Sequence, residues 1–161
     1  MTISIGDKLP DVEFKVKTAD GIEGRSTSDV FSGKTIAVFG IPGAFTPTCS
    51  GSHLPGYLSA LGQFAEKGVD SIACISVNDA HVMKAWAEAT DADGQILFLA
   101  DGNAEFTKAA GLEFDAQAGG MGLRCVRFSM LVDDGIVKDL HIEPIPSQAI
   151  ETSAEKLLTS L

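Results

Sequence analysis

Cys49 lies where an apolar segment gives way to a segment with helix-like spacing. The apolar run Ile36–Phe39 comes first, and the stretch from Pro42 to Ser50 follows it closely. A helix start presents backbone N–H groups without intrahelical partners together with the positive end of the helix dipole, so a thiolate at this position is stabilised. Cys49 is therefore a candidate nucleophile or redox centre.

Thr46 stands three residues before Cys49, where the redox motif Cys-x-x-Cys has its first thiol. A threonine cannot form a disulfide, but its hydroxyl can donate a hydrogen bond to a thiolate or to a bound oxygen. The exchange argues against a thiol–disulfide oxidoreductase of the thioredoxin type.

Length and composition favour a single domain over residues 1–161, since 45% of the chain is hydrophobic and can form a sizeable core. A net charge of -10 disfavours nucleic acids and anionic membranes as partners, because the field repels polyanions. The first residues lack a secretory signal, and no segment has the length of a membrane span, so we expect a cytoplasmic protein.

The three cysteines are dispersed and odd in number, which favours neither a disulfide framework nor a metal cluster. His81 and His141 stand alone, so we expect no metal site.

Apolar, β-branched runs alternate with helix-like segments and predict an α/β fold with a central mixed sheet flanked by helices. Asp133-Asp134-Gly135 predicts a hairpin between the last two runs. The predicted strands are Ile36–Phe39, Ile72–Val77, Ile96–Ala100, Phe128–Val132 and Ile136–Ile142.

Three helices are expected. The first follows Cys49 and ends near Gly68, the second begins at Asp79, and the last begins with a capping box from Thr152 to Glu155. Pro55 removes one N–H from the first helix. It either only kinks this helix or makes its first turns easy to open, which would give a reductant access to Cys49.

The pattern Pro42-x-x-x-Thr46-x-x-Cys49 resembles the active-site signature of the peroxiredoxins, and its extension through Gly56 resembles the type II, atypical group. The likeness covers nearly the whole chain. The resemblance implies a thioredoxin-like fold and thiol-dependent reduction of hydrogen peroxide and organic hydroperoxides without metal, flavin or haem. Its further segments are Ala73–Asp79, Met83–Trp86, Ala100–Gly102, Gly111–Leu112 and Arg127–Met130.

Position by position, the resemblance implies that Cys49 is the peroxidatic nucleophile and that Thr46 binds the peroxide by a hydrogen bond. Arg127 would supply a fixed cation that favours the thiolate and polarises the O–O bond, and Pro42 would shield the thiolate from water. An arginine suits this role because it stays charged when buried and offers donors in a fixed fork.

Arg124, His53 and Phe45 are further candidates for roles near Cys49. Arg124 matches a position where type II members often carry arginine, and it is either a site residue or a solvated loop cation. His53, four residues after Cys49, is expected to hold the loop and the helix start together and not to act as a general base. The resemblance also implies a homodimer formed through the face beside the active site, with Phe45 in it; Phe45 is otherwise an ordinary core residue.

The thiol that resolves the oxidised Cys49 is left open. Animal-type members of the group carry a resolving cysteine before the last helix, but the segment Glu143–Ala149 contains none. Cys74 matches a candidate resolving position of plant-type members, although a cysteine in an apolar strand usually behaves as a small hydrophobe. Cys125 is unexpected; it shares a sheet face with Arg127 if the strand begins that early, and is otherwise a loop thiol.

Because no internal resolver stands out, we expect recycling by an external thiol, either glutathione with glutaredoxin or thioredoxin. The main alternative is a peroxide-sensing relay that passes oxidation to a bound partner, since the same cysteine would serve both functions.

Overall fold

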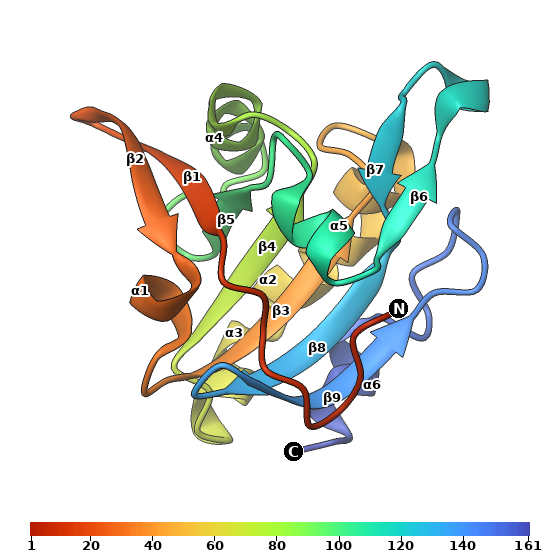
Figure 1. Cartoon of the computed structure of the whole chain (residues 1–161). Helices are drawn as coiled ribbons and strands as arrows, with labels where there is room; N and C mark the ends of the chain where they lie inside the picture. The colour runs from red at the N-terminus through yellow and green to blue at the C-terminus, as the bar shows by residue number, and fades with distance from the viewer.

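The computed structural model describes residues 1–161 and contains a seven-stranded sheet with the order β2-β1-β5-β4-β3-β8-β9 (Figure 1). A separate two-stranded sheet pairs β6 with β7. The strands of the large sheet are β1 (Glu13–Thr18), β2 (Gly21–Ser26), β3 (Thr35–Ile41), β4 (Ser71–Ser76), β5 (Leu97–Ala100), β8 (Phe128–Asp133) and β9 (Ile136–Ile142), and those of the small sheet are β6 (Glu113–Asp115) and β7 (Leu123–Cys125).

The large sheet is mixed, as the sequence predicts. Strand β4 is parallel to both β3 and β5, whereas β8 is antiparallel to β3 and β9. All five predicted strands are confirmed. The hairpin between β8 and β9 is also confirmed, with φ of 48° at Asp134 and 77° at Gly135, the left-handed values that a tight two-residue turn requires.

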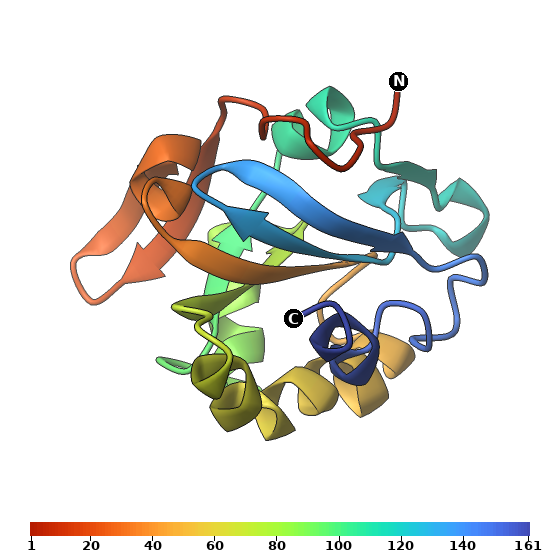
Figure 2. The ribbon, with the colours of Figure 1, turned by 90° about the horizontal axis from the view of Figure 1, so that it is seen from below.

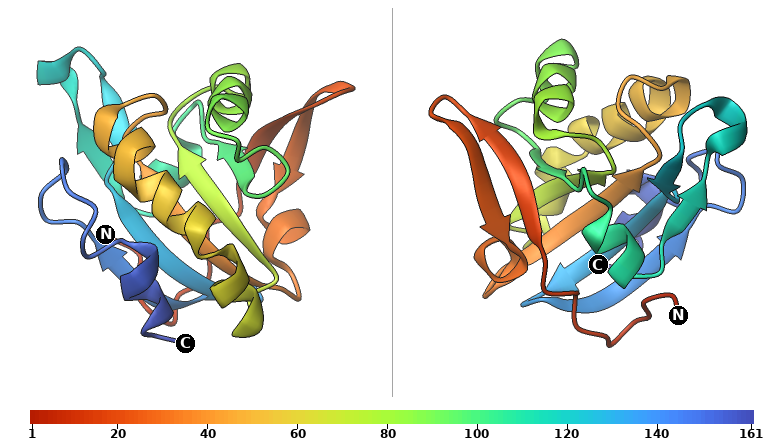
Figure 3. Two further views of the ribbon diagram at one scale, coloured as in Figure 1. Left: turned by 180° about the vertical axis from the view of Figure 1, so that it is seen from behind. Right: turned by 45° about the horizontal axis from the view of Figure 1, so that its top comes forward.

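Helices cover both faces of the large sheet (Figures 2 and 3). Helices α2, α3, α4 and α6 pack on one face, where Tyr57, Phe64, Trp86 and Leu157 are buried in one core. Helices α1 and α5 and the N-terminal segment cover the other face around a second core. The helices are α1 (Thr27–Phe31), α2 (Leu54–Ser59), α3 (Leu61–Glu66), α4 (Ala80–Ala89), α5 (Glu105–Ala109) and α6 (Ala154–Leu158), with a 3₁₀ turn at Gln117–Gly119.

The helix after Cys49 is less regular than its sequence predicts. After two helical residues, Pro47 and Thr48, it forms a π-helical turn, η1 (Cys49–His53), in which the N–H of Leu54 donates to the carbonyl of Cys49 five residues back. It continues as α2, with Pro55 in the first turn, and then as α3 after a break at Ala60. Because the π-helical turn comes directly before it, Pro55 lacks the N–H that would donate to a carbonyl of that turn.

The capping of the predicted helices is partly confirmed. Asp79 caps α4 through a hydrogen bond from the N–H of Val82. The capping box at Thr152 is wrong by one residue, because Ser153 caps α6. The side chain of Thr152 instead bonds the carboxylate of Glu143. No helix is long and apolar enough to cross a bilayer.

Candidate active site

The candidate nucleophile Cys49 is fully buried in the first helical turn after β3. The helix begins one residue after Thr46, whose carbonyl accepts a 3.0 Å bond from the N–H of Ser50. The predicted position of the thiol at a strand-to-helix junction is therefore confirmed.

Arg127 comes immediately before β8 and brings its guanidinium to this thiol. The Nη2 atom donates to Cys49 Sγ at 3.2 Å, although the two residues are 78 positions apart. The Nη1 atom donates to His53 Nδ1 at 3.0 Å and the Nε atom to the carbonyl of Pro146 at 3.2 Å. Arg127 is only 3% exposed, so its charge acts on the sulfur with little screening.

His53 is buried and is held from both ring nitrogens. Its Nε2 lies 3.0 Å from the carbonyl of Thr152, so this nitrogen carries the proton, and Nδ1 accepts from Arg127. Burial lowers the pKa of His53 to about 3, and the positive charge of Arg127 adds to that shift, while the bond to Thr152 opposes it. His53 is therefore a neutral imidazole at physiological pH.

The loop from β3 to Cys49 is anchored by its own polar contacts. The hydroxyl of Thr46 donates to the carbonyl of Gly43 at 2.7 Å, and Asn78 accepts from the N–H of Ala44 at 3.0 Å. Pro42 is buried. Phe45 is 55% exposed and adopts a φ of 65°, a strained value for an aromatic residue. The sequence alternative of Phe45 as an ordinary core residue is wrong.

Arg124 is neither a solvated loop cation nor a partner of Cys49. Its Nη1 donates to the carbonyl of Val77 at 3.0 Å and its Nε to that of Met121 at 2.9 Å. A Cβ placed on Gly43 would lie 3.4 Å from Nη1, so Arg124 borders the same loop. These bonds anchor Arg124 beside the loop that carries Thr46.

The other two thiols are free and fully buried. Cys74 lies in β4 between Phe39 and Phe98, in the same core as Cys49, and burial raises the pKa of its thiol. Cys125 ends β7 and lies in the opposite core, where its thiol donates to the carbonyl of Ile41 at 3.0 Å. Burial raises the pKa of Cys125 to about 12.

Two residues of the site have no clear signal in the sequence. Glu143 follows β9 and is buried, and its Oε2 accepts bonds from the N–H of Ile150 and from both the N–H and the hydroxyl of Thr152. The carbonyl of Thr152 in turn accepts from His53 and from the hydroxyl of Tyr57. The one available signal is the spacing of Asp139, His141 and Glu143 along one strand face, which is weak evidence by itself.

No group of three His, Cys, Asp or Glu side chains is arranged to hold a metal ion. The site instead combines a buried thiol, a fixed cation and a loop with a hydroxyl. This arrangement can stabilise a thiolate and a developing negative charge beside it.

Comparison with known proteins shows which family the chain resembles. The family model described as Redoxin matches residues 4–158. The chain is 44% identical over 165 residues to "Peroxiredoxin-2E-2, chloroplastic" of Oryza sativa subsp. japonica, covering 99% of this chain and 73% of that protein. It is 41% identical to "Peroxiredoxin-2C" of the same organism, covering 99% and 98%. Reduced Prx3 from Vibrio vulnificus in complex with H₂O₂ superposes with a TM-score of 0.93 at 46% identity, covering 99% of both chains.

The fold and the buried thiol beside an arginine define a thiol-dependent redox protein with a thioredoxin-like fold. The chain belongs to the redoxin family and, within it, to the atypical type II peroxiredoxins. It is a thiol-dependent peroxidase, as the resemblance of its signature segments implies.

Proposed function

We propose that Cys49 is the nucleophile of the peroxidase reaction and that Arg127 is its electrostatic partner. The observation that carries this assignment is the 3.2 Å contact between Arg127 Nη2 and the buried Cys49 Sγ. A guanidinium in this position stabilises the thiolate and also lies beside the oxygen atoms that a bound peroxide would present.

In the proposed reaction the Cys49 thiolate attacks one oxygen of the peroxide. An S–O bond forms and the O–O bond breaks, so the sulfur is oxidised by two electrons to sulfenic acid. The departing oxygen takes the bonding pair and a proton from solvent, and leaves as water or as an alcohol. Negative charge therefore moves from sulfur to the leaving oxygen, within reach of a single cation.

Thr46 and Pro42 have supporting roles in this proposal. The hydroxyl of Thr46 already uses its proton on the carbonyl of Gly43. Its lone pairs remain free to accept a hydrogen bond from a peroxide O–H, and this would orient the substrate. The buried ring of Pro42 excludes water near the thiolate.

The proposed substrates are hydrogen peroxide and alkyl hydroperoxides. The similar structure of Prx3 from Vibrio vulnificus is described in complex with H₂O₂, which supports the first of these. We further propose that the chain forms a homodimer through the face that carries Phe45, an exposed aromatic side chain beside the active site.

We propose that an external thiol recycles Cys49, because Cys74 and Cys125 are fully buried and Cys125 also donates to the carbonyl of Ile41. A glutathione thiolate attacks the sulfenic sulfur, so an S–S bond forms and the S–O bond breaks; the departing hydroxide takes a proton from solvent and leaves as water. A second thiol, from glutathione, glutaredoxin or thioredoxin, then attacks the glutathione sulfur, releases the Cys49 thiolate and forms the product disulfide.

The nucleophile is tested by Cys49→Ser, which should abolish peroxide consumption while leaving the melting temperature close to that of the wild type. A serine hydroxyl is not ionised at neutral pH and attacks oxygen poorly. Substantial turnover by this variant would refute the assignment.

Recycling is tested with the double variant Cys74→Ser/Cys125→Ser, assayed with peroxide, glutathione and glutaredoxin. We expect sustained turnover, and mass spectrometry should find glutathione on Cys49 of the peroxide-treated protein. A single turnover that then stops would show that an internal thiol is the resolver.

A further inference from the structure

The guanidinium of Arg127 is held at each of its three nitrogens, and the acceptor opposite Cys49 is unusual. Nη2 donates a hydrogen bond to Cys49 Sγ and Nε donates one to the carbonyl of Pro146. Nη1 donates to a histidine, His53, and not to a carboxylate. A buried arginine is commonly paired with Asp or Glu. A carboxylate there would cancel much of the positive charge that the thiolate needs.

The histidine is itself fixed by the segment that follows β9. The ring nitrogen Nε2 donates to the carbonyl of Thr152, and this bond leaves Nδ1 unprotonated and available to Arg127. The Tyr57 hydroxyl donates to the same carbonyl at 3.0 Å. The Tyr57 ring stacks on Phe39 with centroids 4.3 Å apart, and Phe39 also packs on His53 at 5.0 Å. The imidazole therefore has little freedom to turn.

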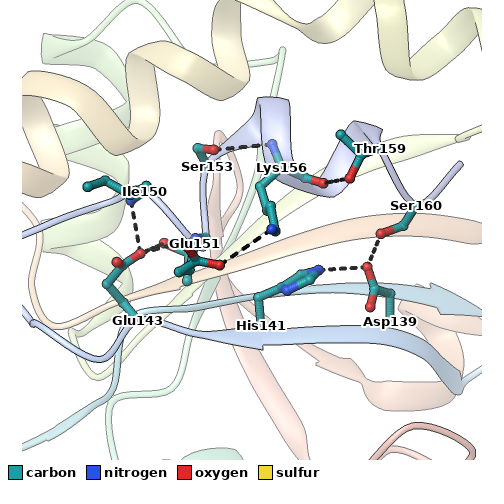
Figure 4. A network of polar contacts seen from close by, with 10 residues as sticks. Asp139, His141, Glu143, Ile150, Glu151, Ser153, Lys156, Thr159 and Ser160 are labelled. Atoms are coloured by element: carbon teal, nitrogen blue, oxygen red, sulfur yellow. Dashed lines mark hydrogen bonds and ion pairs between the residues drawn. The ribbon is translucent and has the colours of Figure 1, made fainter.

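Thr152 is fixed in turn by Glu143. One oxygen of this buried carboxylate accepts from the N–H of Thr152 at 3.1 Å, from its hydroxyl at 3.0 Å and from the N–H of Ile150 at 3.0 Å. Figure 4 shows Glu143 directed toward Ile150 from just after β9, the strand that carries Asp139 and His141. Three bonds thus connect Glu143, Thr152, His53 and Arg127 in series.

We propose that His53 and Glu143 are positioning residues for Arg127: the imidazole holds the guanidinium on Cys49 without neutralising it, and the carboxylate holds the Thr152 carbonyl that orients the imidazole. This inference rests on the roles proposed above for Cys49 and Arg127. The one negative charge in this hydrogen-bonded series is that of Glu143. Thr152 and His53 separate it from the guanidinium, and three donors already bind its carboxylate.

Strand β9, which leads into Glu143, provides a matched control. Asp139 lies four residues before Glu143 and also binds the C-terminal segment, because it accepts from the hydroxyl of Ser160 (Figure 4). Its other side-chain partner, His141, lies in β9 itself. Asp139 has no bond to Thr152, His53 or Arg127. Asp139→Ala therefore loosens the C-terminal segment at its other end without touching the series.

The experiment measures two quantities on the full chain. The first is the second-order rate constant for H₂O₂, by stopped flow. The second is the pH dependence of Cys49 alkylation by iodoacetamide, followed by mass spectrometry of the Cys49 peptide. Melting temperatures establish that each variant is folded.

At position 53, His53→Leu keeps an apolar side chain of similar size and removes both ring nitrogens. We expect its rate constant to fall about 10- to 100-fold, because the reacting groups lose their fixed alignment. His53→Gln provides an amide oxygen for Arg127 and an amide N–H for Thr152, and should be at least about fivefold faster than His53→Leu. His53→Glu keeps an acceptor but adds a negative charge, so it should be slow and its alkylation profile should move to higher pH.

At position 143, Glu143→Ala should lower the rate constant about tenfold, whereas Glu143→Gln keeps an acceptor oxygen and should recover most of that loss. Asp139→Ala should stay within about threefold of the wild type. If a His53 variant does not fold, the comparison of Glu143→Ala with Asp139→Ala decides the inference.

The inference is overturned if folded His53→Leu and Glu143→Ala react as fast as the wild type, or if Asp139→Ala is as slow as Glu143→Ala. It is also overturned if His53→Glu reacts as fast as His53→Gln. An active Cys49→Ser variant would instead refute the proposed function, so the two failures are distinguishable.

Discussion

Replacement of Arg127 by lysine tests the central electrostatic contact, because it keeps the charge and changes only the geometry. The guanidinium donates to Cys49, His53 and Pro146 from three separate nitrogens. A lysine has one nitrogen on a flexible stem and cannot occupy all three positions. An ammonium that stays near the His53 and Pro146 acceptors leaves the sulfur without its donor.

The size of the effect follows from the bond that is lost. Removing one preorganised donor from a developing charge typically costs about 3 kcal/mol, or roughly 10²-fold in rate. The fold loses less: the Pro146 carbonyl lies in an exposed segment and can bind water, so the main structural cost is a buried His53 Nδ1 without a donor, about 1–3 kcal/mol.

The assay is the second-order rate constant of peroxide reduction by stopped flow, with the melting temperature measured in parallel. Arg124→Lys is the matched control, because Arg124 borders the same loop but bonds only the carbonyls of Val77 and Met121. We expect a decrease of about 10²-fold for Arg127→Lys and only a few-fold change for Arg124→Lys. Equal rate constants in Arg127→Lys and the wild type would show that Arg127 is structural.

Two further predictions concern stability. The pKa of His53 is about 3 in the folded chain, against an ordinary value of 6.5. Between these pH values the unfolded chain therefore binds a proton that the folded chain does not. The free energy of unfolding should fall by about 1.4 kcal/mol per pH unit as the pH drops from 6.5 towards 3. Urea unfolding of the wild type and His53→Gln from pH 4 to 7 isolates this slope, and parallel curves would contradict it. Gly40→Ala places a Cβ 1.9 Å from the Phe128 ring and should lower the free energy of unfolding by about 1–3 kcal/mol. It should also slow peroxide reduction, because Phe128 adjoins Arg127. An unchanged midpoint of unfolding in urea would refute the clash.

Local sequence signals were sufficient for much of the central sheet. The five apolar runs and the Asp134-Gly135 turn depend on neighbouring residues, and each forms as expected. The N-terminal hairpin was missed, since β2 (Gly21–Ser26) carries almost no apolar alternation. Strands β6 and β7 have three residues each, too few to show a period of two.

The predicted role of His53 was incomplete for a different reason. Its bond to the Thr152 carbonyl agrees with the expectation that it holds a loop to the helix start. Its bond to Arg127 spans 74 positions, and nothing in the local sequence reports such a pairing. The π-helical turn at Cys49–His53 was missed as well, because the choice between a π and an α turn depends on tertiary contacts.

The meeting of Cys49 and Arg127 follows from the topology of the sheet. Strands β3 and β8 are antiparallel neighbours, and their register pairs Gly40 with Phe128. The end of β3 from which the chain runs to Cys49 therefore lies beside the start of β8, which Arg127 immediately precedes. Gly40 allows this close pairing because any side chain there would occupy the space of the Phe128 ring. A glycine in a strand usually weakens it, but here it fixes the distance between the two segments that supply the thiol and its cation.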